Sequence, residues 1–166
     1  MATSKKITGY LDKNKYKYEI IEHRTTYTAW DTSQTEKVRP QEVAKALVIK
    51  ADNDYLLALV SANRNLDKQK LLKVVNAGRK KAKLGPYKKI DFAKETWMTK
   101  NLHGKVGATP PFRGLLKLDL YADSLLLKGK RIYLGSGEYT NSIRVFTSQY
   151  VKIEKPVKGS FSKSKK

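Results

Sequence analysis

Two apolar runs that lie close together in the chain limit its possible folds more than any other feature. Residues 46–49 (Ala-Leu-Val-Ile) and residues 55–60 (Tyr-Leu-Leu-Ala-Leu-Val) carry no charged side chain. Short apolar runs of this kind are typical of strands that are buried on both faces. The Asp-Asn-Asp sequence at 52–54 favours a turn between them. We therefore expect the second strand to return beside the first, inside a sheet.

Weaker patterns predict the elements around this strand pair. Further strands are expected at residues 16–21, 116–120, 131–134, 143–146 and 150–153. Helices are expected at residues 28–37, 40–45, 67–76 and 92–98, with Thr28 and Asp67 as N-caps, Pro40 in a first turn and Gly78 as a helix stop. The expected fold class is therefore mixed α/β. We expect a single domain with a mixed, largely antiparallel sheet that is flanked by helices and has no regular βαβ period.

The length and the two ends of the chain suggest how it is organised. A chain of 166 residues fits one domain with a real core. We expect a basic N-terminal segment at 1–12, a folded domain at 13–154 and a basic tail at 155–166. This tail holds five lysines and no acid, so we expect it to be disordered. No signal peptide or membrane segment is visible, which makes the cytoplasm the default location.

The charge of the chain points to a polyanionic partner. Its 35 Lys and Arg residues outnumber its 15 Asp and Glu residues, which gives a net charge of +20, and nearby tyrosines add surfaces on which bases can stack. Residues 64–83 are the densest basic stretch, although a merely solvated face is the alternative. The candidate RNA-binding residues in this stretch are Lys70, Lys73, Arg79, Lys80, Lys81 and Lys83.

Several kinds of chemistry find little support in the sequence. The absence of cysteine excludes disulfides, thiolate zinc sites and a cysteine nucleophile. His23 and His103 are the only histidines and lack metal-binding spacing, so neither a metal nor a cofactor is expected. No GxSxG, GxxxxGK[ST] or GxGxxG motif occurs, so neither a serine-hydrolase elbow nor a nucleotide loop is predicted.

Lys45 lies between the expected short helix and the apolar strand at 46–49. A lysine so close to a buried strand loses hydration unless an anion meets it, so a phosphate or carboxylate in a cleft is one interpretation. The alternative is a lysine at a helix C-terminus that is bonded to the last carbonyls. Spacing alone favours this alternative.

Two glycine-containing segments have the composition of pocket walls. Residues 107–112 (Gly-Ala-Thr-Pro-Pro-Phe) form a stiff loop because two prolines restrict the backbone. Residues 135–137 (Gly-Ser-Gly) allow a ligand to approach the backbone closely. The alternatives are a tight connection for the first segment and a hairpin turn for the second.

Taken together, these segments resemble the YbaK-type aminoacyl-tRNA deacylases, a family that includes the inserted editing domain of bacterial prolyl-tRNA synthetases. The resemblance covers about residues 16–153, and the Lys45 segment at 43–49 is its most specific part. The other matching segments are residues 22–28, 65–71, 106–112, 121–125 and 135–139.

The resemblance implies roles for individual residues. Lys45 would anchor the 3′-terminal nucleotide of the substrate, and Gly137 would offer backbone contacts to the ester and the attacking water. The substrate-binding residues that it implies are Tyr27, Gly107, Pro111, Phe112, Asp123, Ser136 and Tyr139. The sequence departs from the family at Tyr139, where many members carry His, at Arg113, where Gly is usual, and before Gly107, where a Thr-Gly pair is missing. These departures concern the substrate more than the fold.

These implications lead to one expected function and its alternatives. We expect a trans-acting deacylase that binds the acceptor end of mischarged tRNA, with a synthetase as a further candidate partner. An aminoacyl ester is already activated, so a positioned water and oriented donors can suffice without a catalytic triad. The leading alternative is a non-catalytic RNA-binding module with the same fold. A structural protein of a ribonucleoprotein fits the basic ends but not the pocket-like loops.

Overall fold

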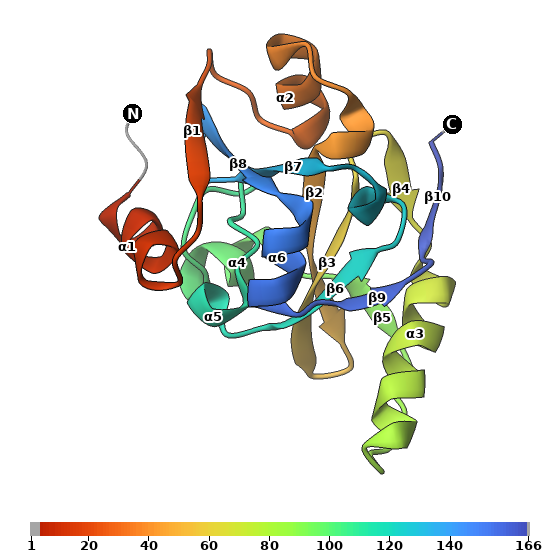
Figure 1. Ribbon diagram of the computed structural model, residues 1–166. Coiled ribbons are helices and arrows are strands. Elements are labelled where there is room, and N and C mark those ends of the chain that lie inside the picture. Colours follow the sequence, from red (N-terminus) through yellow and green to blue (C-terminus); the bar gives the residue numbers. More distant parts are fainter. Residues whose placement is uncertain (1–3, 166) are drawn as a thin grey trace.

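The computed structural model describes residues 4–165, in which helices and strands alternate along much of the chain (Figure 1). The helices are α1 (Lys5–Lys13), α2 (Ala29–Glu36), α3 (Lys68–Lys81), α4 (Glu95–Asn101), α5 (Arg113–Leu116) and α6 (Thr147–Glu154), with the short 3₁₀ helices η1 (Pro40–Glu42) and η2 (Leu126–Lys128). The strands are β1 (Tyr18–Glu22), β2 (Ala44–Ala51), β3 (Asp54–Ser61), β4 (Arg64–Leu66), β5 (Ile90–Phe92), β6 (Asp119–Asp123), β7 (Arg131–Gly135), β8 (Asn141–Phe146), β9 (Val157–Gly159) and β10 (Ser162–Ser164). Within residues 4–165, no helix is long and apolar enough to cross a membrane.

The expected strand pair lies inside a five-stranded sheet of order β5-β2-β3-β6-β9. β2 and β3 are antiparallel, from Ala44 opposite Ser61 to Ala51 opposite Asp54. β6 then joins β3 in parallel, and β9 joins β6 in parallel. The sheet is therefore mixed, as predicted. β5 pairs only with the 49–51 end of β2, so the other end of β2 pairs with β3 on one side and, within residues 4–165, has no partner strand on the other.

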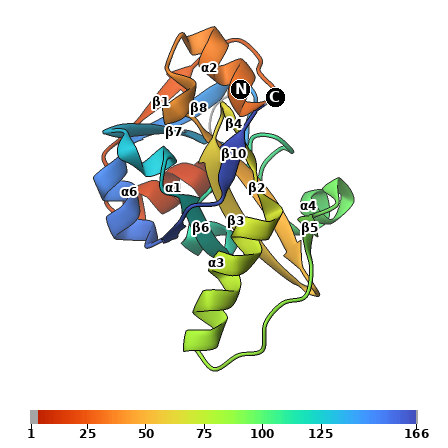
Figure 2. The ribbon, with the colours of Figure 1, turned by 90° about the vertical axis from the view of Figure 1, so that its right-hand side faces the viewer.

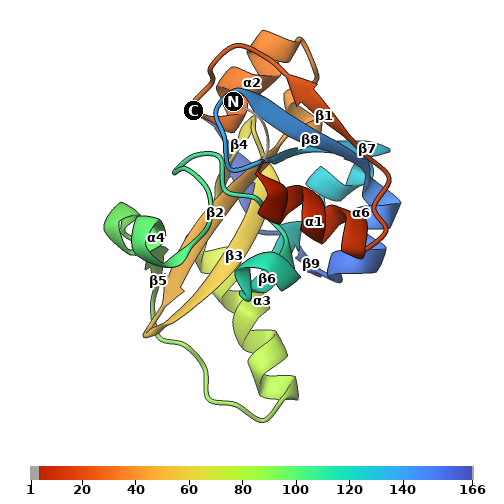
Figure 3. The same cartoon turned by 90° about the vertical axis from the view of Figure 1, so that its left-hand side faces the viewer.

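The two faces of β3 belong to two different cores because successive side chains of a strand point to opposite faces. Leu57 and Leu59 pack into the larger core, which also contains side chains of α1, α6, β7 and β8. Leu56 and Ala58 belong to the other core, together with Leu71 of α3. Figures 2 and 3 show α3 on one side of β3 and helices α1 and α6 on the other.

A second, antiparallel sheet of order β1-β8-β7 lies across the end of the first (Figure 1). β8 pairs with β1 from Tyr18 opposite Val145 and with β7 from Arg131 opposite Phe146. An isolated parallel bridge between Val43 and Tyr133 joins β7 to the start of β2. This crossing places the loop after β7 and the beginning of β8 beside the unpaired end of β2.

The expectation that residues 155–166 form a disordered tail is wrong for the residues that the structure describes, and the basic N-terminal segment is also folded from Ser4 on. In the N-terminal segment, α1 begins after its N-cap Ser4 and buries Ile7 and Leu11 in the larger core. In the C-terminal segment, β9 and β10 pair with β6 and β4, and the Phe161 side chain is 0% exposed. One aromatic side chain among the lysines reaches a core that the composition of the tail does not reveal.

Several expected elements also differ in type or extent. α3 continues through Gly78 to Lys81, since nothing crowds this exposed glycine and the chain need not turn there. Residues 150–153 belong to α6 because Tyr150 and Ile153, three residues apart, both contact the larger core. The alternation at 116–120 is split between the end of α5 and β6. The helix expected at 40–45 is only η1, which leaves Lys45 inside β2.

Candidate active site

A cavity of about 300 Å³ lies beside the unpaired end of β2. We call it the β2 cavity. Small apolar side chains form much of its wall, among them Ala44, Ala46 and Val48, which alternate along β2. α2, α4 and the loop at 106–109 contribute further walls, and Glu138 and Ser142 add polar groups. A mostly apolar, concave site with few polar groups is typical of a small-molecule site.

Lys45 lines the β2 cavity from within the strand, and its side chain is half-buried. Its ammonium donates hydrogen bonds to the Arg64 carbonyl at 2.6 Å and to Asn65 Oδ1 at 3.4 Å. Burial lowers the pKa of Lys45, and the nearby charge of Lys165 lowers this pKa further. None of the ion pairs found within residues 4–165 includes Lys45. The helix C-terminus interpretation is therefore wrong, since the lysine is a strand residue with an unneutralised charge.

Gly107 occupies the cavity wall at a point where the chain leaves no room for a side chain. Its φ angle is +90°, and a Cβ atom there would lie 2.3 Å from the Tyr27 carbonyl oxygen. The Tyr27 ring is 61% exposed and does not line the cavity, but it meets the Tyr139 ring edge-on at 4.8 Å between centroids. Gly107 thus fits the expected pocket loop, whereas Tyr27 and Tyr139 lie beside the pocket.

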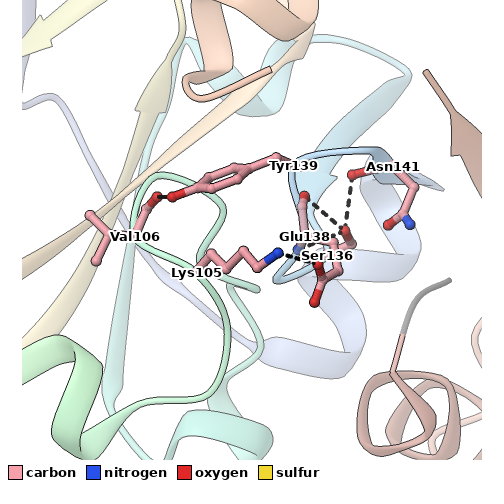
Figure 4. A network of polar contacts seen from close by, with 6 residues as sticks. All are labelled: Lys105, Val106, Ser136, Glu138, Tyr139 and Asn141. Atoms are coloured by element: carbon pink, nitrogen blue, oxygen red, sulfur yellow. Dashed lines mark hydrogen bonds and ion pairs between the residues drawn. The ribbon is translucent and has the colours of Figure 1, made fainter. Parts of the chain in front are cut away.

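A polar network fastens this loop to the segment after β7 (Figure 4). The Tyr139 hydroxyl donates a hydrogen bond to the Val106 carbonyl. The Lys105 ammonium pairs with the Glu138 carboxylate at 2.8 Å, and this bond raises the pKa of Lys105. The hydroxyl of buried Ser136 donates to the Asn141 carbonyl at 2.9 Å. Ser136 and Tyr139 therefore shape the wall by holding backbone segments in place.

Gly137 does not have the free backbone donor that the resemblance implies. Its N–H donates to the Ala108 carbonyl at 2.7 Å, and its carbonyl accepts from the Lys105 N–H at 2.9 Å. Its φ angle is +88°, and an added Cβ would lie 3.2 Å from the Cα of Gly104. Gly137 does not line the β2 cavity. The structure explains this glycine by close packing of two loops rather than by contact with an ester.

Three other residues expected at the site lie in the folded core instead. Phe112 is fully buried between the rings of Tyr10 and Tyr16, at centroid distances of 5.5 and 5.7 Å. The carbonyl of buried Pro111 accepts a hydrogen bond from the hydroxyl of Tyr150 in the core. The carboxylate of Asp123 accepts hydrogen bonds from the C-terminal segment. The expected pocket loop at 107–112 therefore begins at the wall of the cavity with Gly107 and ends in the larger core with Phe112.

A serine–histidine pair at the cavity was not found from the sequence. His23 Nδ1 lies 2.7 Å from the Arg24 carbonyl oxygen, and His23 Nε2 lies 2.9 Å from Ser142 Oγ. A carbonyl can only accept, so Nδ1 carries a proton, and in the neutral imidazole Nε2 accepts the Ser142 hydroxyl. Ser142 lines the β2 cavity. His103 does not line it and instead contacts Ser4 Oγ at 3.0 Å.

The expected tRNA-binding residues lie on and just beyond α3, which projects from the sheet (Figure 1). All of them except Arg79 are exposed. Arg79 is half-buried because it donates to the Gly85 carbonyl and lies 3.9 Å from the Tyr87 ring centroid. The exposed set is Lys70, Lys73, Lys80, Lys81 and Lys83. None of these residues lines the β2 cavity.

Comparisons with known proteins place the chain in a family. No curated protein matches the chain. A solved structure of a proposed trans-editing enzyme for prolyl tRNA synthetase is 19% identical, with a TM-score of 0.80 over 98% of this chain and 100% of that one. The solved structure of a hypothetical protein is 17% identical, with a TM-score of 0.79 over 96% of this chain and 100% of that one. The structure of a scaffold protein for epitope grafting is also 17% identical, with a TM-score of 0.81 over 99% of each chain. These identities support the fold alone. A family model described as the aminoacyl-tRNA editing domain matches residues 23–153, and the chain therefore belongs to the family of aminoacyl-tRNA editing domains.

Proposed function

We propose that the protein is a trans-acting deacylase that hydrolyses the ester of mischarged tRNA. The observation that carries this proposal is the position of Lys45, a half-buried residue on the wall of an apolar cavity whose ammonium takes part in none of the ion pairs found within residues 4–165. The cavity would take the aminoacyl group, while the ammonium would hold a phosphate of the terminal nucleotide. An anion in the complex would also offset the desolvation of the ammonium.

The cavity suits a small, uncharged amino acid. Its volume of about 300 Å³ is at the lower end for ligand sites, and its β2 wall is built from short side chains. Water would attack the ester carbonyl, and its proton would pass through the Ser142 hydroxyl to His23 Nε2, which accepts in the neutral imidazole whose Nδ1 donates to the Arg24 carbonyl. The C–O bond to the terminal ribose would then break, and the same proton would return through Ser142 to the leaving ribose oxygen, which releases the free amino acid and the tRNA. The neighbouring hydroxyl of the terminal ribose would assist. Positioned proton transfer of this kind contributes roughly 10²–10⁴-fold to a rate.

α3 would bind the acceptor stem. Its exposed lysines neutralise phosphates without reading the bases, which suits a contact that only positions the tRNA. One observation favours the alternative of a non-catalytic RNA-binding module: the Gly137 N–H is already bonded to the Ala108 carbonyl and is not free to stabilise an oxyanion. A synthetase partner is a further expectation for which no surface stands out.

A deacylation screen separates the two functions. Transfer RNAs charged with each amino acid in turn are incubated with the protein, and release of the labelled amino acid is compared with spontaneous hydrolysis. We expect faster release for small, uncharged amino acids, and a decrease of about 10²-fold in Ser142→Ala, which removes only a hydroxyl. Tight tRNA binding with no release above the spontaneous rate for any amino acid would establish the non-catalytic module instead.

A further inference from the structure

A second hollow adjoins Lys45 on the side of β4 and β10. We call it the β4–β10 groove. Its volume is about 560 Å³, and its lining residues include Lys45, Asn65, Lys68, Phe92 and Lys163. Lys45, Leu47 and Phe92 line both this groove and the β2 cavity. The two hollows therefore share part of their walls, with Lys45 among the residues common to both.

The C-terminal strand that forms one side of the groove is fixed in position. β10 pairs antiparallel with β4, with Lys163 opposite Asn65. The Asp123 carboxylate accepts the N–H groups of Phe161 and Ser162 and the Ser162 hydroxyl. Arg64 Nε donates to Ser162 Oγ at 2.7 Å. These bonds and the buried Phe161 ring fix the backbone that carries Lys163 of β10.

The cations of this region outnumber the available acids. Lys68 is paired with Asp91 at 2.8 Å. The Asp67 carboxylate, also in the groove, accepts the Lys70 N–H and caps α3.

Lys45, Lys163 and Lys165 take part in none of the ion pairs found within residues 4–165. The Lys165 ammonium contacts the Ala62 carbonyl and lies 4.7 Å from the Trp30 ring centroid. Its positive charge also lowers the pKa of Lys45. Three ammonium groups without acidic partners form a site for successive phosphates.

We propose that Lys163 and Lys165 of the C-terminal strand, together with Lys45, bind the phosphates of the single-stranded 3′ end of the tRNA. This inference rests on the proposed function, since it extends the path of the same substrate from the β2 cavity into the groove. Phe92, whose side chain is 48% exposed beside the groove, offers a ring on which a base can stack. The C-terminal segment is then part of the substrate site rather than a diffuse source of positive charge.

The test compares two double variants that remove the same charge. Lys163→Ala/Lys165→Ala removes one lysine from the groove wall and one from the neighbourhood of Lys45, whereas Lys130→Ala/Lys152→Ala removes two exposed lysines near and on α6 that line neither hollow. The probe is a short single-stranded RNA that ends in CCA and carries no amino acid, and its binding is followed by fluorescence anisotropy at several salt concentrations. We expect the groove variant to bind on the order of tenfold more weakly. The plot of log K against log salt should become shallower, with the magnitude of its negative slope smaller by about 1.4. This corresponds to about 0.7 for each of the two phosphates that the variant no longer neutralises.

Two further measurements make the result decisive. Lys163→Arg/Lys165→Arg keeps both charges and should retain most of the affinity, and thermal unfolding of every variant checks that the fold is intact. An equal loss of affinity in the groove and α6 variants would overturn the inference.

Deacylation by the unmodified protein, measured in parallel, tests the proposed function alone. If release is absent but the groove variant still loses affinity selectively, the function fails and the groove stands. If release occurs and the groove variant keeps its affinity and salt slope, the groove fails and the function stands.

Discussion

α3 and the C-terminal segment at 156–165 are both rich in lysine, yet the structure uses them differently. α3 packs Leu71 and Val75 on the sheet and extends its lysines into solvent. The C-terminal segment buries Phe161 completely and lies along β4, which brings Lys165 close to Lys45. The comparison teaches that charge density in the sequence indicates how strongly a segment attracts a polyanion, whereas anchoring decides where the polyanion is held.

The difference also concerns the strength and range of each interaction. Charges on exposed α3 side chains interact through water and are screened by salt within about 10 Å at 0.1 M. Lys45 is half-buried and faces a lower effective dielectric constant, which strengthens its attraction to an anion at short range. We therefore expect α3 to contribute general affinity for tRNA, and the Lys45 region to position the ester.

The largest expected effect tests whether the C-terminal segment is anchored. Phe161→Ala leaves a cavity in a core that is otherwise filled, so it should lower the free energy of unfolding by about 3–5 kcal/mol. Leu84→Ala, which changes an exposed side chain just beyond α3, should alter it by about 0.5 kcal/mol or less. Both values are measured by denaturant unfolding. Equal stability of the two variants would mean that the segment is the loose tail that its composition suggests.

The second effect concerns catalysis at Lys45. Lys45→Ala removes the ammonium on the wall of the β2 cavity and should lower the single-turnover rate of deacylation by about 10²-fold, because small misplacements of an ester are expensive. Lys45→Arg keeps the charge but changes its shape, so it should recover only part of the rate.

Lys152→Ala on α6 removes an exposed lysine and is the control for this experiment. It should keep the full rate, and thermal unfolding should show that all three variants are folded. A folded Lys45→Ala protein with normal deacylation would remove Lys45 from the site. The proposed difference between the Lys45 region, which positions the ester, and α3, which attracts the tRNA, would then be wrong.

A third, smaller effect concerns α3 alone. Replacing Lys70, Lys73, Lys80 and Lys81 together by alanine should weaken tRNA binding at low salt. The slope of log K against log salt should decrease by about 0.7–0.9 for each phosphate that is no longer neutralised. The weakening should be similar for every tRNA because these side chains reach phosphates rather than bases. An unchanged salt slope, measured by titration, would show that the helix does not face the tRNA.

The smallest effect is a pH dependence that separates Lys45 from the other lysines. Its pKa is lowered by burial and by Lys165, so the ammonium loses its proton at a lower pH than the usual 10.5. Affinity for a CCA-ended RNA should begin to fall as the pH rises through this lowered value, since only the charged form binds phosphate. The Lys45→Arg variant stays charged and should lose this part of the pH dependence.

Folding stability should respond to the same proton in the opposite direction. A lowered pKa means that the folded protein binds fewer protons than the unfolded chain in this pH range. The contribution of Lys45 to the free energy of unfolding therefore rises with pH between its folded and unfolded pKa values. Denaturant unfolding of the protein and of Lys45→Arg over this range measures the difference. A parallel fall of stability and affinity in both proteins would contradict this assignment.

The sequence by itself determined the features that depend on neighbouring residues. The apolar runs at 46–49 and 55–60 form the expected antiparallel pair. Thr28 and Asp67 cap α2 and α3, each by accepting a backbone N–H three residues ahead. The excess of positive charge is a property of composition, and the resemblance correctly indicated the family. These signals are readable because a cap, a turn or a buried run is formed by residues a few positions apart.

Tertiary structure alone decided which residues meet at the site. His23 and Ser142 are 119 positions apart and come together only because β1 pairs with β8. Gly137 and Phe112 belong to segments that resemble the family. The backbone of Gly137 is nevertheless bonded to a neighbouring loop, and Phe112 is buried in the core. Phe161 lies in a segment whose composition predicts disorder, and its burial depends on a space bounded by α3 and β3. Composition cannot show such a space, because distant parts of the chain create it only when they pack together.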